Sequence, residues 1–334
     1  MKTKEVYVDS FKNVWMDIYV VGYPEEGESI LCVIRDKRDI KYTFMTDSYI
    51  FCHTKGWYNH VDHLLNQMKV DHLDAFIWTH PDLDHSLDIP RMLDTYDKLH
   101  QAQIYMPSLD GVNGMKPVAV ATNNYLYNKY SAKGSQKYHV KVVDVDEYEE
   151  NDEKMVLAKG MLRVKIIEKY NITGAPIACV FKYMSPIRDY VSRYEHFHMK
   201  PNFNDLSLSV ALSVNGKNIL LCGDIEDRTI KRIDDNCLHD VVYIKIPHHA
   251  SGKSSGYLFE RLQKNQIRAA IATTTIYKAN NLPEVDLLKK YKTISKEVYT
   301  TGSNKQHLYG CIKSSVHIED FNIETICDGS AMVV

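Results

Sequence analysis

The 334-residue sequence predicts an α/β fold, in which buried strands alternate with helices. Short, nearly continuous apolar runs, of which 73–79 (LDAFIWT) is the clearest, are typical of strands buried on both faces. Other segments have apolar residues that recur with helical spacing. Three of the buried strands run directly into loops that contain His or Asp. We therefore expect the sheet edge where these strands end to hold a constellation of functional side chains.

The composition is that of an ordinary globular protein, with 44% hydrophobic residues, 25% charged residues and a formal net charge of −2. This charge gives no overall basic footprint for nucleic acid, although a local basic patch is compatible with it. The seven cysteines are scattered without a C-x-x-C pair, which favours a reducing compartment. No apolar run suits a signal peptide or a membrane span, so we expect a cytoplasmic protein without membrane contact.

The N-terminal part of the chain predicts three strands, a helix and a fourth strand. Residues 15–23, 29–36 and 41–51 alternate in polarity and are separated by turn-rich or charged segments. Residues 57–68 predict a helix, because their apolar residues recur at i, i+3, i+4 and i+7. The apolar run 73–79 then predicts a buried strand that leads into the sequence HPDLDH.

The central and C-terminal parts predict one insertion on an otherwise regular scaffold. Residues 110–160 predict an insertion or lid within a single domain that covers 1–334. Two apolar runs within 206–224 flank Asn215-Gly216, which predicts a β-hairpin. The other elements that we expect are strands at 161–170, 241–247 and 268–276, helices at 257–265 and 283–291, and closing strands at 297–302 and 311–316.

A group of His and Asp residues directly follows the strand at 73–79. His80, Asp82, Asp84 and His85 lie within six positions, and this mixture of imidazole and carboxylate suits Zn²⁺, Mn²⁺ or Fe²⁺. In a turn, alternate residues point to one side, so these side chains can face one cavity. The alternative is a surface turn in which Asp84 caps the next helix.

Two further strands end in residues of the same kind. Asp224 follows the second strand of the predicted hairpin, where a carboxylate can bridge two cations through its two oxygens. His248 and His249 follow the strand at 241–247, and either ring can reach a cavity. The segment HHASGKSSG is not a phosphate-binding loop, because Pro247 stands where that motif needs glycine. Lys253 within it could still contact an anionic substrate.

As a set, these motifs resemble the metallo-β-lactamase superfamily, and most closely its ComEC-type competence-protein branch. The resemblance covers roughly 15–315 and depends on four segments in order: THPDLDH (79–85), NDLSL (204–208), LLCGD (220–224) and IPHHAS (246–251). It implies a four-layer αβ/βα sandwich with a binuclear metal site. The membrane channel of the competence proteins has no counterpart in this sequence, so the resemblance does not imply DNA uptake.

The resemblance also implies a role for each matching residue. The first metal ion would be held by His80, Asp82 and Asp224, with Asn204 or Asp205 as open alternatives for a further ligand. The second would be held by Asp84, His85, Asp224 and His249, with Asp224 as the bridge. His249 is preferred to His248 because it directly precedes the small residue Ala250, and Asp47 would orient the first loop.

The expected activity is hydrolysis assisted by two divalent ions, Zn or Mn, with Fe as an alternative. Asp84 would accept a proton from water, and His248 or Lys253 would stabilise charge on the departing oxygen. Asp82 replaces a histidine of the superfamily signature, which shifts preference toward harder ions such as Mn²⁺. Ala250 replaces a glycine.

The competence-type resemblance points to a phosphodiester substrate, in a nucleic acid or in an anionic small molecule such as a nucleotide. One alternative is hydrolysis of a lactone, thioester or lactam at the same site. Another is a non-catalytic metal-binding sensor or scaffold, because fold does not determine function. The sequence identifies no protein partner.

Overall fold

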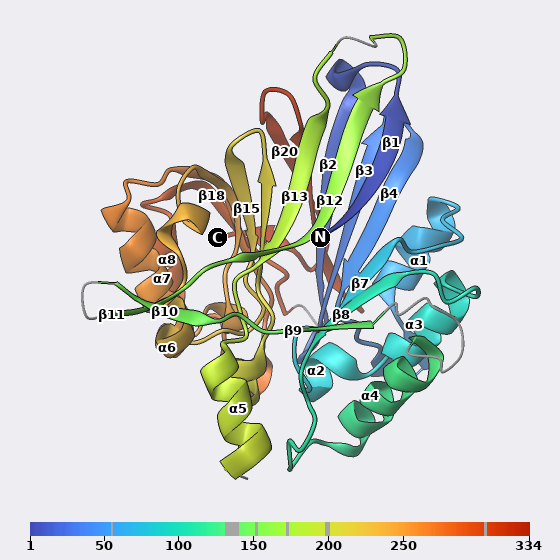
Figure 1. Ribbon diagram of the computed structural model, residues 1–334. Helices are drawn as coiled ribbons and strands as arrows, with labels where there is room; N and C mark the ends of the chain where they lie inside the picture. The colour runs from blue at the N-terminus through green and yellow to red at the C-terminus, as the bar shows by residue number, and fades with distance from the viewer. Residues whose placement is uncertain (55, 131–139, 151–152, 172–173, 198–200, 304–305) are drawn as a thin grey trace.

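The computed structural model describes residues 1–334 except 55, 131–139, 151–152, 172–173, 198–200 and 304–305. Two large mixed sheets lie in the middle of the molecule, and helices lie to both sides of them (Figure 1). The mixed α/β fold predicted from the sequence is confirmed. No helix in the described residues is long and apolar enough to cross a membrane.

The first large sheet has eight strands. In their order across the sheet they are β20 (Ile323–Gly329), β19 (Gly310–His317), β2 (Val14–Gly22), β3 (Glu28–Asp36), β4 (Asp39–Thr46), β7 (Ala75–Ile77), β8 (Gln103–Pro107) and β9 (Val140–Val143). Neighbours from β20 to β4 are antiparallel, whereas β4, β7, β8 and β9 run parallel. The carboxyl ends of β4 and β7 therefore lie side by side at one edge of this sheet.

The second large sheet has nine strands. In order they are β1 (Lys2–Val8), β12 (Lys159–Glu168), β13 (Ile177–Tyr183), β14 (Val210–Val214), β15 (Lys217–Leu221), β16 (Val241–Lys245), β17 (Ala269–Thr274), β18 (Ser295–Thr300) and β21 (Met332–Val333). The strands β15 to β18 are parallel, so their carboxyl ends also share one edge. Two small hairpins complete the strands: β5 (Phe51–His53) with β6 (Gly56–Tyr58), and β10 (Glu147–Glu150) with β11 (Glu153–Val156).

Helices lie on the outer faces of both sheets. The helices are α1 (His60–Gln67), α2 (Leu83–Ser86), α3 (Ile89–Tyr96), α4 (Pro117–Tyr130), α5 (Arg188–Phe197), α6 (Asp227–Ile230), α7 (Gly252–Lys264) and α8 (Val285–Tyr291). One apolar cluster joins α1, α3 and α4 to the eight-stranded sheet. A second joins α6, α7 and α8 to the nine-stranded sheet, and a third lies between the two sheets.

The strand β3 shows why the central strands read as continuous apolar runs. Its side chains alternate between two cores: Ile30 and Ile34 face the core between the sheets, whereas Leu31 and Val33 face the helices. All four residues are buried, with exposed fractions of 0–1%. A strand covered on both faces has no solvent-facing positions, so its sequence lacks the polar alternation of a surface strand.

The predicted hairpin forms at the predicted turn. β14 and β15 pair antiparallel, with Val214 opposite Lys217. Asn215 and Gly216 connect them with φ values of 46° and 79°. Two consecutive left-handed residues match the right-handed twist of the strands, and asparagine and glycine adopt that conformation most readily.

Several elements differ from the sequence-based prediction. The strand expected at 41–51 ends at Thr46, and the helix expected from residue 57 begins at His60, where the side chain of Asn59 caps it. The helix expected from Pro283 begins at Val285. Several strands in the middle of the chain were not predicted, among them β6, β8, β9, β10, β11 and β13. Nor were the three strands β1, β20 and β21, which lie nearer the ends of the chain. These are edge strands or have one exposed face, so their sequences contain no continuous apolar run.

The segment 110–160, expected as an insertion or lid, includes parts of the main scaffold. Within it α4 packs against α2 and α3, and β9 extends the eight-stranded sheet by pairing with β8. Thr122 of α4 also donates a hydrogen bond of 3.3 Å to the backbone oxygen of Ser86 in α2. Residues 131–139 and 151–152 of this segment lie outside the described residues.

Candidate metal centre

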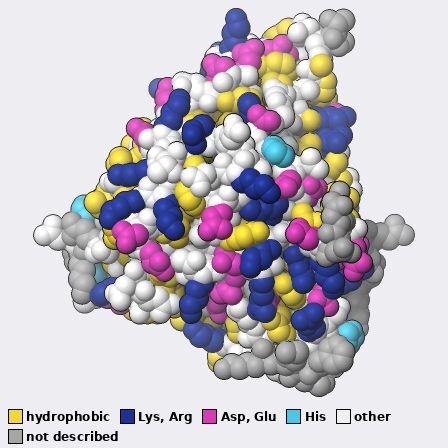
Figure 2. Space-filling model, turned by 90° about the vertical axis from the view of Figure 1, so that its left-hand side faces the viewer, with side chains coloured by type: hydrophobic (Ala, Val, Ile, Leu, Met, Phe, Trp, Pro, Cys, Tyr) yellow, Lys and Arg dark blue, Asp and Glu magenta, His cyan; other side chains and the backbone are white. Residues whose placement is uncertain are grey.

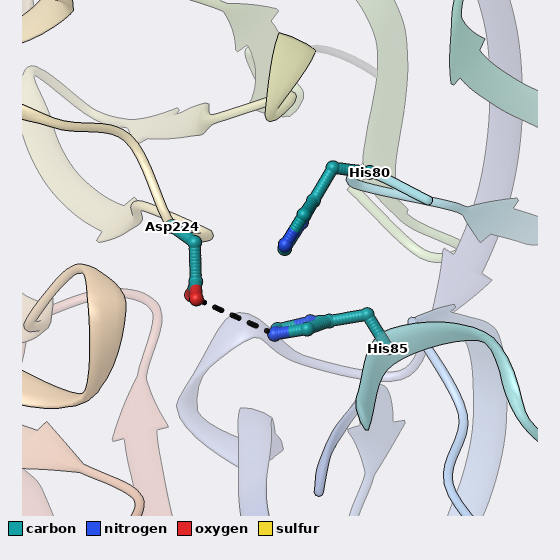
Figure 3. A group of neighbouring side chains, drawn as sticks. All are labelled: His80, His85 and Asp224. Atoms are coloured by element: carbon teal, nitrogen blue, oxygen red, sulfur yellow. Dashed lines mark ion pairs between the residues drawn. The ribbon is translucent and has the colours of Figure 1, made fainter. Parts of the chain in front are cut away.

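The carboxyl ends of three strands from both sheets bring the predicted ligands together. His80 and Asp82 follow β7, and Asp84 and His85 lie in the short helix α2 directly after them. Asp224 follows β15 and comes from the other sheet, as does His249, which follows β16 in a single 3₁₀ turn, η4 (His248–Ala250). In Figure 3 the rings of His80 and His85 point toward the carboxylate of Asp224 across the space between their loops.

The ligand atoms form two overlapping groups. The atoms of His80, His85 and Asp224 lie within 4.8 Å of one another, and so do those of Asp84, His85 and His249. All five residues are buried. The Oδ2 atom of Asp224 lies 3.6 Å from Nε2 of His85 and 3.6 Å from Nε2 of His249. This carboxylate therefore contacts ligand atoms of both groups.

The distances between these nitrogen and oxygen atoms are longer than hydrogen bonds and agree with the distance between two ligands of one ion. Oδ2 of Asp84 lies 3.4 Å from Nε2 of His85 and 3.3 Å from Nε2 of His249. Hydrogen bonds between such groups are about 2.7–3.2 Å long. Two ligands that sit about 2.0–2.2 Å from one tetrahedral ion are about 3.3–3.6 Å apart. The measured contacts fall in the second interval.

Each imidazole is held by its other ring nitrogen. Nδ1 of His80 lies 2.9 Å from Oγ1 of Thr79, Nδ1 of His85 lies 2.7 Å from Oδ2 of Asp47, and Nδ1 of His249 lies 2.8 Å from Oγ1 of Thr275. Hydrogen bonds of this kind fix the ring orientation and the tautomer of metal-binding histidines. All three Nε2 atoms are thereby left to face the cluster.

The three Nε2 atoms and one carboxylate oxygen have no hydrogen-bond partner within the described structure. They are Nε2 of His80, His85 and His249, and Oδ1 of Asp224. Buried polar atoms without partners are costly and few in native proteins. Four such atoms on neighbouring residues, with every corresponding Nδ1 occupied, form a donor set that suits a bound cation. No ion is present in the structure, and the fit rests on this donor set.

Asp47 contacts one imidazole directly and a second one through Thr79. Besides His85, its carboxylate accepts hydrogen bonds from the backbone N and Oγ1 of Thr79, at 2.7 and 2.6 Å. Asp47 is 1% exposed and has a φ of 56°, a left-handed conformation that Asp tolerates better than most residues. This turn ends β4 and directs the carboxylate under the loop that begins at Thr79.

The backbone of η4 is strained at the position that aims His249. His248, His249 and Ala250 have φ values of 47°, 52° and 56°, and each left-handed residue other than glycine costs about 1–2 kcal/mol. The turn is held by hydrogen bonds from the backbone N of His248 to Gly223 O (3.1 Å) and of Ala250 to Pro247 O (3.0 Å). Backbone strain of this kind clusters at functional sites.

Charges inside the cluster compensate one another. Burial alone would raise the pKa of Asp84, but the positive charge of His85 and the neighbouring His249 hold it well below its usual value. The same holds for the pKa of Asp224. Burial would lower the pKa of His85, but Asp84, Asp224 and Asp47 raise it well above the usual value. Without a cation the imidazole therefore retains a proton, which a bound metal ion would have to displace.

The predicted substrate-contacting residues lie at the rim of the cluster. His248 is part-buried, and its Nδ1 lies 2.9 Å from Oγ of Ser254 and 3.8 Å from Oε1 of Glu226. Burial lowers the pKa of His248, although Asp224 opposes this. Oδ2 of Asp82 lies 3.5 Å from Nε2 of His80, and its side chain is 35% exposed. Lys253 is exposed in the first turn of α7.

Asp205 and Asn204 are not brought into the cluster. The carboxylate of Asp205 is completely buried, but it contacts the hydroxyl of Tyr194 and the guanidinium of Arg228. The side chain of Asn204 donates a 3.0 Å hydrogen bond to Glu226. Neither residue belongs to the two groups of converging ligand atoms, so a ligand role for either of them stays a prediction of the resemblance.

Sequence reasoning did not identify the residues behind His80 and His249. Thr79 and Thr275 hold these rings, and the carboxylate of Glu28 lies behind Thr275. Thr79 directly precedes His80, so its position was a usable signal. Glu28 and Thr275 are 247 positions apart in the sequence, and only the packing of the two sheets makes them neighbours.

Comparison with known proteins does not add to this description. No protein-family model matches the chain, and no curated protein matches it.

Proposed function

We propose that the protein is a metal-dependent hydrolase with a binuclear site that cleaves a phosphodiester, in a nucleic acid or a nucleotide. The proposal rests chiefly on one observation, the convergence of four buried, unpartnered ligand atoms. They belong to His80, His85, His249 and Asp224. A structural cluster of ion pairs would be expected to join these atoms by hydrogen bonds, and the measured separations are longer than that.

The charge and the arrangement of the cluster support two ions. Two groups of ligand atoms overlap, and Asp224 touches both. Asp47, Asp82, Asp84 and Asp224 together have four negative charges when ionised, which two divalent cations would balance. The abundance of carboxylate supports Mn²⁺ beside Zn²⁺, whereas the three imidazoles also suit Fe²⁺.

The layered fold supports the same class of enzyme. Two facing sheets with helices on both outer sides, and candidate ligands at one shared edge, support the αβ/βα sandwich that the metallo-β-lactamase resemblance implies. We therefore propose that the protein has this four-layer αβ/βα sandwich.

The chain's own residues would divide the work of hydrolysis. When bound, the divalent ions would supply Lewis acidity and lower the pKa of a water molecule. Asp84 faces the cluster, so its carboxylate is placed to receive the proton of an attacking water. If the hydroxyl of Ser254 donates to Nδ1 of the neutral His248 ring, Nε2–H of that ring can donate a hydrogen bond that stabilises charge on the departing oxygen.

An anionic substrate would need positive charge at the site. Figure 2 shows one face of the molecule, on which Lys and Arg are intermingled with Asp and Glu. The formal net charge of −2 also provides no general attraction for anions. Bound cations, with Lys253 nearby in sequence at the start of α7, would supply that attraction locally.

The test combines metal analysis with a panel of substrates. We expect more than one equivalent of Zn, Mn or Fe per chain, and chelator-sensitive hydrolysis of single-stranded DNA, RNA, cyclic nucleotides or a bis-aryl phosphodiester. A lactone and a thioester are assayed in parallel. Hydrolysis of these carbon esters alone would refute the proposed substrate class. A metal content near zero in metal-replete buffer would refute the proposal that the protein is a metal-dependent hydrolase.

A matched pair of neighbours tests the assigned roles. His249→Ala should reduce metal content, because its Nε2 is one of the converging atoms. His248→Ala should leave metal bound and slow turnover, because that ring faces Ser254 at the rim. The reverse result would show that the ligand assignment is wrong.

A further inference from the structure

A buried ion pair joins the two sheets behind the candidate metal centre. Glu28, the first residue of β3, is 1% exposed, and Lys245, the last residue of β16, is 0% exposed. Nζ of Lys245 lies 2.5 Å from Oε2 of Glu28. Burying two charges is expensive, and such a pair is often no more stabilising than apolar residues of similar volume. Its position therefore calls for an explanation other than stability.

The ion pair continues into the metal centre through one hydroxyl. Oγ1 of Thr275, one residue beyond β17, donates a 2.6 Å hydrogen bond to Oε2 of Glu28. The same Oγ1 lies 2.8 Å from Nδ1 of His249. The series Lys245–Glu28–Thr275–His249 is buried throughout, so water does not compete for these contacts.

The donors and acceptors in this series determine where the proton of His249 lies. A hydroxyl has one proton, and an ionised carboxylate can only accept. Because Thr275 donates to Glu28, its oxygen can only accept from His249. Nδ1 of His249 must then hold a proton, and in the neutral ring Nε2 keeps the lone pair that faces the cluster.

The same arrangement occurs a second time in the structure. Oγ1 of Thr79 donates to Oδ2 of Asp47 at 2.6 Å and lies 2.9 Å from Nδ1 of His80. Two histidines from different sheets are thus each held by a threonine that is itself held by a buried carboxylate. Asp47 lies within 2.7 Å of His85 as well, whereas Glu28 has Lys245 as its second partner.

We propose that Glu28 is a positioning residue which, through Thr275, keeps the proton of His249 on Nδ1 and leaves Nε2 free to bind a cation. Lys245 is the counter-charge that keeps Glu28 an acceptor. Burial alone would raise the pKa of Glu28, but Lys245 and the histidines lower it, and burial of Lys245 is outweighed by Glu28, which raises its pKa. The inference rests on the proposed metal centre for its purpose.

The test variant removes the hydroxyl of Thr275 and keeps the shape of its side chain. Thr275→Val deletes the link between Glu28 and His249 with little change in volume, and Thr275→Ser restores it. Thr273→Val is the matched control, because Thr273 is also buried near the end of β17, but its hydroxyl contacts Tyr243 instead. Glu28→Gln is a second variant that weakens the acceptor.

Two measurements are made on each variant. The first is the ¹⁵N chemical shift of the His249 ring nitrogens in chelator-treated protein, at alkaline pH where imidazoles are neutral. The second is Zn²⁺ affinity by competition with a chromophoric chelator. We expect the Nδ1–H tautomer in the wild type, in Thr275→Ser and in Thr273→Val. We expect loss of that tautomer preference, and about 10- to 100-fold weaker Zn²⁺ binding, in Thr275→Val.

The two measurements separate this inference from the proposed function. An unchanged tautomer and unchanged Zn²⁺ affinity in folded Thr275→Val would overturn the inference, whatever the enzyme does. An equal loss in Thr273→Val would also overturn it, because the effect would then be a general loss of packing. If the tautomer responds as expected but wild-type protein binds no metal, the positioning role is supported and the proposed metal centre fails.

Discussion

Asp224 gives the most direct test of the metal centre, because its carboxylate lies 3.6 Å from two imidazoles, those of His85 and His249. The variant Asp224→Asn keeps the volume of the side chain but removes the negative charge and replaces one acceptor oxygen with an NH2 donor. If the carboxylate binds cations in both groups, the variant should lose affinity for each of them. If the cluster is only a set of ion pairs, metal binding should be absent from the start.

The magnitude follows from the number of ligands. Structural Zn²⁺ sites with four ligands bind with about 10–16 kcal/mol at neutral pH. Each ligand thus accounts for about 2.5–4 kcal/mol, or about 70- to 800-fold in affinity. Because Asp224 touches both groups of ligand atoms, its replacement should lower the bound metal from more than one equivalent to well below one at micromolar free Zn²⁺.

The assay is elemental analysis after equilibrium dialysis, supported by chelator competition. Asp205→Asn is the matched control: its carboxylate is equally buried and comes from the segment beside Asp224, but it contacts Tyr194 and Arg228. Thermal unfolding with chelator identifies any general loss of stability. Equal metal affinity of Asp224→Asn and wild type would refute the assignment, as would an equal loss in Asp205→Asn.

Two further predictions concern stability away from the metal centre. Burial lowers the pKa of His60 to about 4 from 6.5, so the folded protein favours the neutral ring. Between pH 6.5 and pH 4 the unfolded chain binds a proton on His60 that the folded protein does not bind. The free energy of unfolding should therefore fall by about 3 kcal/mol as the pH drops from 6.5 to 4. Urea unfolding across that interval should show a shallower acid dependence for His60→Gln, and an identical dependence would contradict the prediction. Phe181 is completely buried between the sheets. Its ring is packed edge-on against that of Phe44, and the two ring centroids are 4.9 Å apart. Phe181→Ala should lower the free energy of unfolding by about 3–5 kcal/mol, and a loss below about 1 kcal/mol would contradict the two-sheet core.

The α/β fold class and several strands could be predicted from the sequence because they depend on local chemistry. A strand such as β7 is apolar throughout because both its faces are buried, and that burial is visible in the sequence itself. The turn at Asn215-Gly216 was predictable for a similar reason, since its left-handed backbone favours those two residue types. Strands with an exposed face, such as β20, lack that signal.

The kinds of ligand, and the loops that contain them, could also be read from the sequence. Histidine and aspartate directly after buried strands indicated a metal site before any distance was known. The contacts that each of these side chains makes could not be predicted from the sequence. Asp205 was an open alternative that only the superfamily resemblance offered, and the helices α5 and α6 bring Tyr194 and Arg228 to its carboxylate, a contact that no local pattern predicts.

The choice between adjacent histidines depended on backbone geometry. The left-handed turn at His248 and His249 directs the second ring into the cluster and the first toward Ser254. The sequence contains the two residues but not the direction in which each one points. The superfamily resemblance had favoured His249, and the turn supplies a physical reason for that preference.

The support behind His249 was decided by tertiary structure alone. Glu28 begins a strand of one sheet, whereas Lys245 ends a strand of the other and Thr275 directly follows the neighbouring strand. Glu28 and Thr275 are 247 positions apart in the sequence. Each of these residues is unremarkable in its local segment. They become partners because the two sheets pack face to face with these strand ends aligned. A buried polar group needs a hydrogen-bond partner, and for Thr275 and Lys245 that partner is Glu28 of the other sheet.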